Sequence, residues 1–195
     1  AEALTNIVFA PLENGIHSIS LSANWMWPCT TPGEDSRLYE AVEECSKFAI
    51  DLGINIPTGK DSLSMKQKYP NYDVLSPGTV IISAAGQCSN LKNIIKPVAT
   101  FKGGDFFYVD FAQDEFYLGG SSFAQSQECI GNDTPGVMNA VYFKRAFNTV
   151  QDHINAGKIS AGHDIGSGGL IASLLELCFP SLNIGIDLDF SCLKE

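Results

Sequence analysis

Residues 32–57 read PGEDSRLYEAVEECSKFAIDLGINIP, and this stretch decides the fold class. Thr31, Pro32 and Glu34 form a helix-start signal, in which Thr31 caps the helix, Pro32 takes the first helical position and Glu34 closes a capping box. Gly53 then predicts the end of the helix. Between these signals, apolar side chains recur at helical spacing, at Leu38, Ala41, Val42, Cys45, Phe48, Ala49 and Leu52.

Strands and helices alternate on both sides of this helix, which predicts an α/β fold. The segments 79–85 and 170–179 are apolar enough to be a buried strand and a buried helix. A Lys-Gly-Gly-Asp sequence at 102–105 marks a domain boundary near residue 100, between residues 1–99 and 100–195. The other expected strands are 17–23, 54–57, 106–110, a short one before Gly162 and 183–188, and the other expected helices are 1–9, 119–129 and 138–156.

The composition favours a protein that covers its apolar surface with other protein. Apolar residues make up 45% of the 195 residues, 12 are Phe, and charged residues make up 17%, against roughly 25% in an average soluble domain. We therefore expect the isolated chain to self-associate. The net charge of −10 excludes a nucleic-acid partner, which needs a basic surface, but it does not exclude a nucleotide ligand.

The six cysteines lack a CxxC pair and a histidine at zinc spacing. We expect buried free thiols in a reducing cytoplasm. No apolar run reaches the ~18 residues of a membrane helix and no signal peptide opens the chain, so we expect no membrane partner. The chain starts without Met inside an expected helix and ends without a terminating signal, which suggests an internal piece of a longer protein.

The glycine-rich run GHDIGSGG at 162–169 is the sharpest candidate for a binding site. Glycines let a phosphate approach the backbone, and the N-terminus of the following helix offers N–H groups to an anion. Gly166, Ser167 and Gly168 are therefore candidate phosphate-binding residues, and Asp164 is a candidate ligand for the accompanying cation. The alternative is an ordinary turn in which Asp164 and Ser167 cap the helix.

Two further segments carry candidate ligands. Glu2 and Asn6 lie four positions apart, on one face of the first expected helix, and their oxygens would suit Mg²⁺. The alternative is a solvated helix end. The sequence TGKDSLS at 58–64 fails the Walker A pattern in spacing and in the residue after Lys60.

The polar turn expected at Thr58–Ser62 still offers ligand groups. Lys60 and Ser62 are candidate phosphate-binding residues, and Asp61 is a candidate metal ligand. The alternative is a plain turn with a surface lysine. Trp25 and Trp27 favour core packing or a domain interface over ligand stacking.

These segments together resemble phosphoribosylformylglycinamidine synthase, the ATP- and glutamine-dependent ligase of purine biosynthesis. The similarity covers nearly the whole chain, in the family's order, and is to the second of two related halves of the large single-chain form. The matching segments are EALTNI (2–7), LSANWM (21–26), PGE (32–34), GKDSLSM (59–65), SP (76–77), VIISA (80–84), HD (163–164) and GGL (168–170).

The resemblance implies a fold like that of aminoimidazole ribonucleotide synthetase. Residues 1–99 would be the later part of an N-terminal-type domain, and residues 100–195 the start of a C-terminal-type domain. It also implies that ATP activates the amide oxygen of formylglycinamide ribonucleotide and that ammonia from a separate glutaminase domain displaces phosphate. Glu2, Asn6 and Asp164 would hold Mg²⁺ at a site for ATP or ADP, and the partners would be the other synthetase half and the glutaminase domain.

The resemblance assigns no catalytic residue to this chain, which we expect to be inactive alone. Gly166 and Ser167 depart from the family, which carries Ser and Asp there, so the Gly166 backbone would have to replace a side-chain contact. One alternative is a non-catalytic module that holds ADP as a structural element. Another is a selenophosphate synthetase or thiamine phosphate kinase of the same fold, against which Asn24-Trp25-Met26 and Lys60-Asp61-Ser62 argue.

Overall fold

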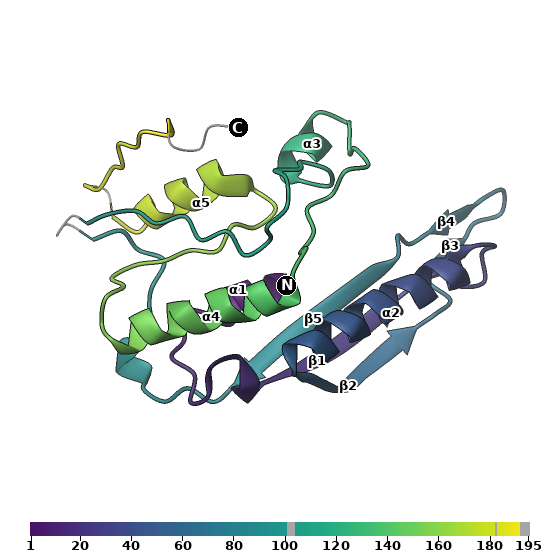
Figure 1. Ribbon diagram of the computed structural model, residues 1–195. Helices are drawn as coiled ribbons and strands as arrows, with labels where there is room; N and C mark the ends of the chain where they lie inside the picture. Colours follow the sequence, from purple (N-terminus) through teal and green to yellow (C-terminus); the bar gives the residue numbers. More distant parts are fainter. Residues whose placement is uncertain (101–103, 182, 192–195) are drawn as a thin grey trace. The chain divides into compact units, whose positions relative to one another are not determined.

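The computed structural model describes residues 1–100, 104–181 and 183–191 (Figure 1). The chain forms two compact units that interleave along the sequence. The first unit comprises Ala1–Pro11, Asn90–Asn139 and Thr149–Glu195, and the second comprises Leu12–Ser89 and Ala140–Asn148. Each unit is described separately below.

The second unit is built on a three-stranded sheet in the order β2-β1-β5. The central strand β1 (Ile19–Met26) pairs in parallel with β2 (Asn55–Ser62) and antiparallel with β5 (Thr79–Gly86). Ile19, Leu21 and Ala23 are buried, while the polar side chains that alternate with them are half-buried. This alternation gives the sheet one apolar face and one polar face.

The helix α2 (Glu34–Leu52) connects β1 to β2 and runs along the sheet (Figure 1). It ends where the sequence predicts, because Gly53 adopts a left-handed φ of 74° and its N–H donates to the carbonyls of Ala49 and Ile50. A parallel β1–β2 pair needs such a crossover, so this unit contains a βαβ element. The mixed helices and strands confirm the α/β class.

The expected capping box at the start of α2 is wrong. Gly33, with φ of 88°, is the N-cap, and no side chain caps the helix. Pro32 lies in the preceding turn, in which Glu34 N–H donates to the Thr31 carbonyl over 3.1 Å. The Glu34 carboxylate pairs with Arg37 at 2.6 Å instead of reaching back to the cap.

Other expectations for the second unit need correction. The segment 17–23 is not all strand, because its first residues close the 3-10 helix η1 (Gly15–Ser18) and β1 begins only at Ile19. The stretch expected as a polar turn, Thr58–Ser62, continues β2, because β1 offers it a parallel partner along its whole length. The segment 79–85 forms β5, but this is an edge strand whose Val80 and Ile81 are exposed, not buried. A hairpin not expected from the sequence, β3 (Lys66–Lys68) with β4 (Asp73–Leu75), extends beyond the sheet (Figure 1).

The segment 140–148 completes the second unit as the first half of α4 (Ala140–Asn155). Phe143 is fully buried and packs edge-on against Phe48 of α2, with ring centres 5.5 Å apart. Asn148 accepts a hydrogen bond from the Ile16 N–H at 3.2 Å. These contacts join α4 to the sheet unit.

The first unit holds the remaining helices, α1 (Glu2–Ile7), η2 (Leu91–Asn93), α3 (Ser122–Ser126), the second half of α4, and α5 (Gly169–Cys178). Buried Gln151 of α4 donates to the carbonyls of Val8 and Ala10, which follow α1. Residue 99 contacts α5 through a hydrogen bond of 2.8 Å from the Ala99 N–H to the Leu177 carbonyl.

Several expectations for this unit are wrong. The expected strands at 106–110, before Gly162 and at 183–188 are not strands in the part of the chain that the structure describes. A strand needs a neighbouring strand for its N–H and C=O groups, and these segments have none there. The expected helix 119–129 is reduced to α3. The helix α5 forms as predicted, but it is not buried all round, since Ile171, Leu175 and Phe179 are exposed.

Candidate functional site

The glycine-rich run turns the chain into α5 within the first unit. Gly169 has a left-handed φ of 77°, and its N–H donates to the Gly166 carbonyl over 3.0 Å. No side chain caps α5. The alternative in which Asp164 and Ser167 cap this helix is therefore wrong. Apart from the Gly169 N–H, the N–H groups of its first turn are available to a ligand.

The segment before the turn is fixed by side chains on both sides of Asp164. The Ser173 hydroxyl of α5 donates to the Asp164 carbonyl over 3.0 Å. The His163 ring lies between this carbonyl, at 2.7 Å from Nδ1, and the Glu176 carboxylate, at 3.1 Å from Nε2. The Asp164 carboxylate is partly exposed and projects from a backbone that α5 holds in place.

Ser122 of α3 contacts the glycine run, although the sequence did not single it out. Its N–H donates to the Ser167 carbonyl over 2.9 Å, and the two hydroxyl oxygens lie 3.3 Å apart. The only sequence signal was the weak motif LGGSS at 118–122. Ser167 therefore lies between two helix starts, and its hydroxyl is held by another hydroxyl.

The residues Lys60, Asp61 and Ser62 lie at the end of β2, in register with Asn24, Trp25 and Met26. Side chains of successive strand residues point to opposite faces. Lys60 and Ser62 therefore share one face of the sheet, and Asp61 lies on the other face, beside Trp25. Because these residues form a strand and not the expected turn, Lys60, Asp61 and Ser62 do not all lie on the same face.

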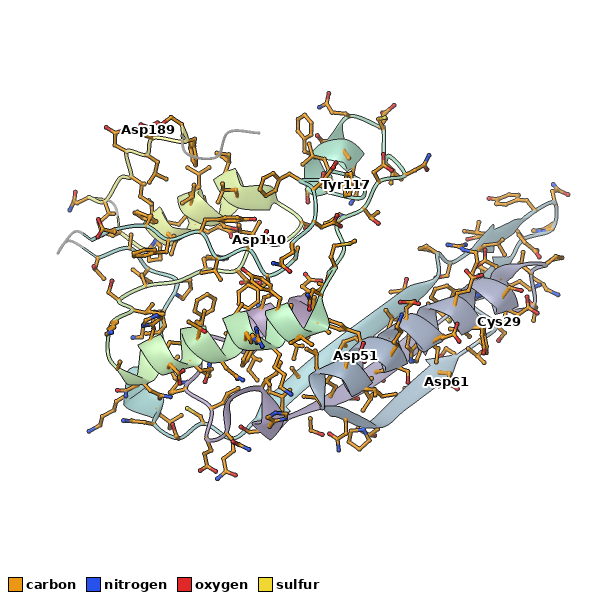
Figure 2. All side chains as sticks on the ribbon, viewed as in Figure 1. Cys29, Asp51, Asp61, Asp110, Tyr117 and Asp189 are labelled. Carbon is orange, nitrogen blue, oxygen red and sulfur yellow. The ribbon has the colours of Figure 1, made fainter. Side chains whose placement is uncertain are left out.

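A shallow pocket open to solvent lies at this part of the sheet, with a volume of about 340 Å³. Figure 2 shows Asp61 on β2, where it lines the pocket. Trp25 is half-buried in the pocket wall, whereas Trp27 is 6% exposed and packs on Gly78. Core packing thus describes Trp27 but not Trp25. The pocket is lined by Ala23, Trp25 and residues 56–61.

The metal ligands proposed from the sequence come from both compact units. Glu2 and Asn6 are exposed on α1, and with Asp164 they belong to the first unit, whereas Asp61 belongs to the second. Over residues 1–100, 104–181 and 183–191, no three His, Cys, Asp or Glu side chains gather at metal-binding separation. The Mg²⁺ site therefore stays a prediction.

The cysteines give no sign of a nucleophile. Those at 29, 45, 88, 129 and 178 are free thiols, as predicted, but none is fully buried and Cys129 is exposed; Cys192 lies outside the described residues. Burial raises the pKa of Cys45, which disfavours its thiolate. In the described part of the chain, no helix has both the length and the hydropathy needed to cross a bilayer.

Two segments of the chain match models of known protein families. Residues 1–87 match the family model of the FGAR-AT PurM_N-like domain, and residues 117–195 match that of the AIR synthase related protein, C-terminal domain. The chain thus belongs to the class of proteins related to AIR synthase. The predicted domain boundary near residue 100 lies between the two matched ranges and stays a prediction.

Curated relatives narrow this class to one family. The chain is 40% identical over 192 residues to the probable phosphoribosylformylglycinamidine synthase, chloroplastic/mitochondrial, of Arabidopsis thaliana, covering 97% of this chain and 14% of the relative. It is 34% identical to the phosphoribosylformylglycinamidine synthases of Drosophila melanogaster and Homo sapiens, covering 98% and 97% of this chain and 14% of each relative. The chain belongs to the phosphoribosylformylglycinamidine synthase family and spans about one seventh of the length of these relatives.

Proposed function

We propose that this chain is a nucleotide-binding part of a phosphoribosylformylglycinamidine synthase. In the proposed reaction, the amide oxygen of formylglycinamide ribonucleotide takes the γ-phosphoryl group of ATP, and ammonia derived from glutamine displaces phosphate. The products are formylglycinamidine ribonucleotide, ADP and phosphate. The similarity over 97% of the chain to synthases of this name is the observation that carries the proposal.

The glycine-rich run suits the phosphates of a nucleotide. A methyl group built on Gly166 would meet no atom within 4 Å, so open space lies beside the backbone there. The uncapped start of α5 adds N–H donors, and the helix dipole favours an anion at that end. We propose that Gly166, Ser167 and Gly168 bind phosphate through these donors. Lys60 and Ser62, which belong to the second unit, are proposed separately as phosphate-binding residues.

Bound phosphates carry charge that Mg²⁺ offsets, and Mg²⁺ takes oxygen ligands. The partly exposed Asp164 carboxylate lies two residues before Gly166 on a fixed backbone. We propose Asp164, Glu2 and Asn6, all of the first unit, as its ligands, and Asp61 of the second unit is proposed separately as a metal ligand. The proposed partners are the remaining synthetase half and a glutaminase domain, and the free thiols favour a reducing compartment such as the cytoplasm.

Nucleotide binding tests this proposal. A valine at Gly166 fits the chain itself but would occupy the open space, so Gly166→Val should weaken ADP binding in the presence of Mg²⁺ at least about tenfold in calorimetric titration. Gly185→Val is the matched control, since Gly185 also has no neighbour within 4 Å and lies outside the run. Asp164→Asn should remove the dependence of ADP affinity on Mg²⁺.

Equal ADP affinity of Gly166→Val and the unaltered chain would contradict the phosphate site. If the ADP affinity of Asp164→Asn depended on Mg²⁺ as strongly as that of the unaltered chain, only the assignment of Asp164 as a metal ligand would be contradicted. The alternative, ADP held as a structural element, predicts that ADP purifies with the chain and does not exchange with added nucleotide.

A further inference from the structure

Trp25 is more exposed to solvent than the other residues on its side of β1. Ile19, Leu21 and Ala23 are 3%, 7% and 5% exposed, as expected for the apolar face of a sheet. Trp25 continues this row but is only half-buried; it lines the pocket, and its ring centre lies 6.5 Å from that of Trp27. A large aromatic surface left open in a hollow offers a stacking platform to a flat ligand.

Asp61 lies directly beside this tryptophan. The two residues are partners in the parallel β1–β2 register, so their side chains lie on the same face. Asp61 is exposed and has no ion-pair partner among the residues that the structure describes. The pocket therefore combines an indole ring with a carboxylate that has a free charge.

Gly59, which has no side chain, also lines the pocket beside Trp25 and Asp61. Gly59 precedes Asp61 by two residues on the same face and is in register with Ala23. A side chain at Gly59 would collide with the Ala23 carbonyl oxygen, which lies 1.9 Å from an ideal Cβ position. The pocket that these residues line has a volume of about 340 Å³, enough for roughly ten water volumes.

We infer that this pocket binds a planar organic cation of the amidinium or guanidinium class. The face of an indole attracts cations, and a carboxylate pairs with two parallel N–H donors of a planar cation. Mg²⁺, for which Asp61 is proposed above as a ligand, is the competing occupant of this pocket. The register neighbours of Asp61 on this face, an indole, a glycine and an alanine, offer Mg²⁺ no side-chain oxygen. Lys60 also lines the pocket, and its register partner is Asn24, the neighbour of Trp25 on β1.

An amidine is also the group that the proposed reaction creates from an amide. If the proposed function holds, the pocket would favour the product group over the substrate group; this step rests on the proposed function. The binding inference itself is tested with a probe that contains neither nucleotide nor ribonucleotide, so that the two can fail separately.

The test compares benzamidinium with benzamide, its neutral analogue of nearly the same shape. The chain contains two tryptophans, so its ¹H–¹⁵N spectrum has two indole signals, which Trp25→Phe assigns. Benzamidinium should shift the Trp25 signal in a saturable way and by more than the signal of Trp27, whose ring centre lies 6.5 Å from that of Trp25. Asp61→Asn should weaken this binding about tenfold, because it removes a charge-assisted pair from an exposed position without disturbing the core.

Asp51→Asn is the matched control, because Asp51 is an exposed carboxylate in α2 and does not line the pocket. It should leave benzamidinium affinity unchanged. The inference is overturned if benzamide shifts the Trp25 signal as strongly as benzamidinium, if Asp61→Asn binds benzamidinium like the unaltered chain, or if Mg²⁺ alone saturates the site and displaces the probe.

Discussion

Gln151 shows how a single polar side chain holds the end of a helix. It is 3% exposed, and its amide donates to the carbonyls of Val8 and Ala10, the latter over 3.0 Å. These carbonyls follow the last turn of α1, where helical hydrogen bonds run out. The side chain therefore supplies donors that the backbone lacks.

Replacing Gln151 with Met keeps the shape of the side chain but removes its donors. We expect Gln151→Met to lower the free energy of unfolding by about 2 kcal/mol, because buried carbonyls lose their partners. Urea unfolding followed by circular dichroism measures this. The matched control is Gln125→Met on α3, where the side chain is exposed and donates one hydrogen bond, to the Gly120 carbonyl; it should cost less than about 0.5 kcal/mol. Equal losses in both variants would contradict the capping role.

At the residue scale, the sequence predicts best where a role depends on local conformation. Gly53 is an example, since the residue that ends α2 adopts a left-handed conformation, and glycine adopts this conformation most readily. Ser122 could not be assigned in this way, because its partner Ser167 lies 45 positions further along the chain. Trp25 and Asp61 become neighbours only through the register of two strands.

At the scale of elements, α2 depends on its C-terminal glycine. Gly53 has φ of 74°, and a Cβ there would lie 3.2 Å from the His17 ring. Gly53→Ala should therefore lower the free energy of unfolding by about 1 kcal/mol through backbone strain. Gly53→Asn should recover part of this loss, because asparagine tolerates the left-handed region. Thermal unfolding compares the two variants; equal stability of Gly53→Ala and the unaltered chain would contradict the strain.

Helices were predicted better than strands, for a physical reason. The helices α2, α4 and α5 form their hydrogen bonds within one segment, so spacing and end signals suffice to locate them. A strand forms only with a partner. The segments 106–110 and 183–188 have strand-like sequences but no partner among the described residues, whereas 58–62 has a turn-like sequence and finds β1.

At the scale of the whole molecule, exposed apolar side chains predict self-association. Phe107, Phe116 and Ile171 are among many large apolar residues with more than half of their surface exposed. We expect a concentration-dependent dimer or larger species in sedimentation velocity. Added salt should strengthen it by screening the net charge of −10. A monomer that is insensitive to dilution and to salt would contradict this expectation.

The interleaving of the two units has a consequence for synthesis on the ribosome. Residues 12–89 emerge first, but the α4 segment that packs Phe143 against Phe48 ends at Asn148, which follows 59 residues after Ser89 (148 − 89). At a translation rate of roughly 5–20 residues per second, about 3–12 s pass between the synthesis of Ser89 and that of Asn148. During this interval Phe48 has no partner from α4, and the edge strand β5 can pair with other chains. The nascent chain is thus open to chaperones, or to wrong partners, until α4 emerges.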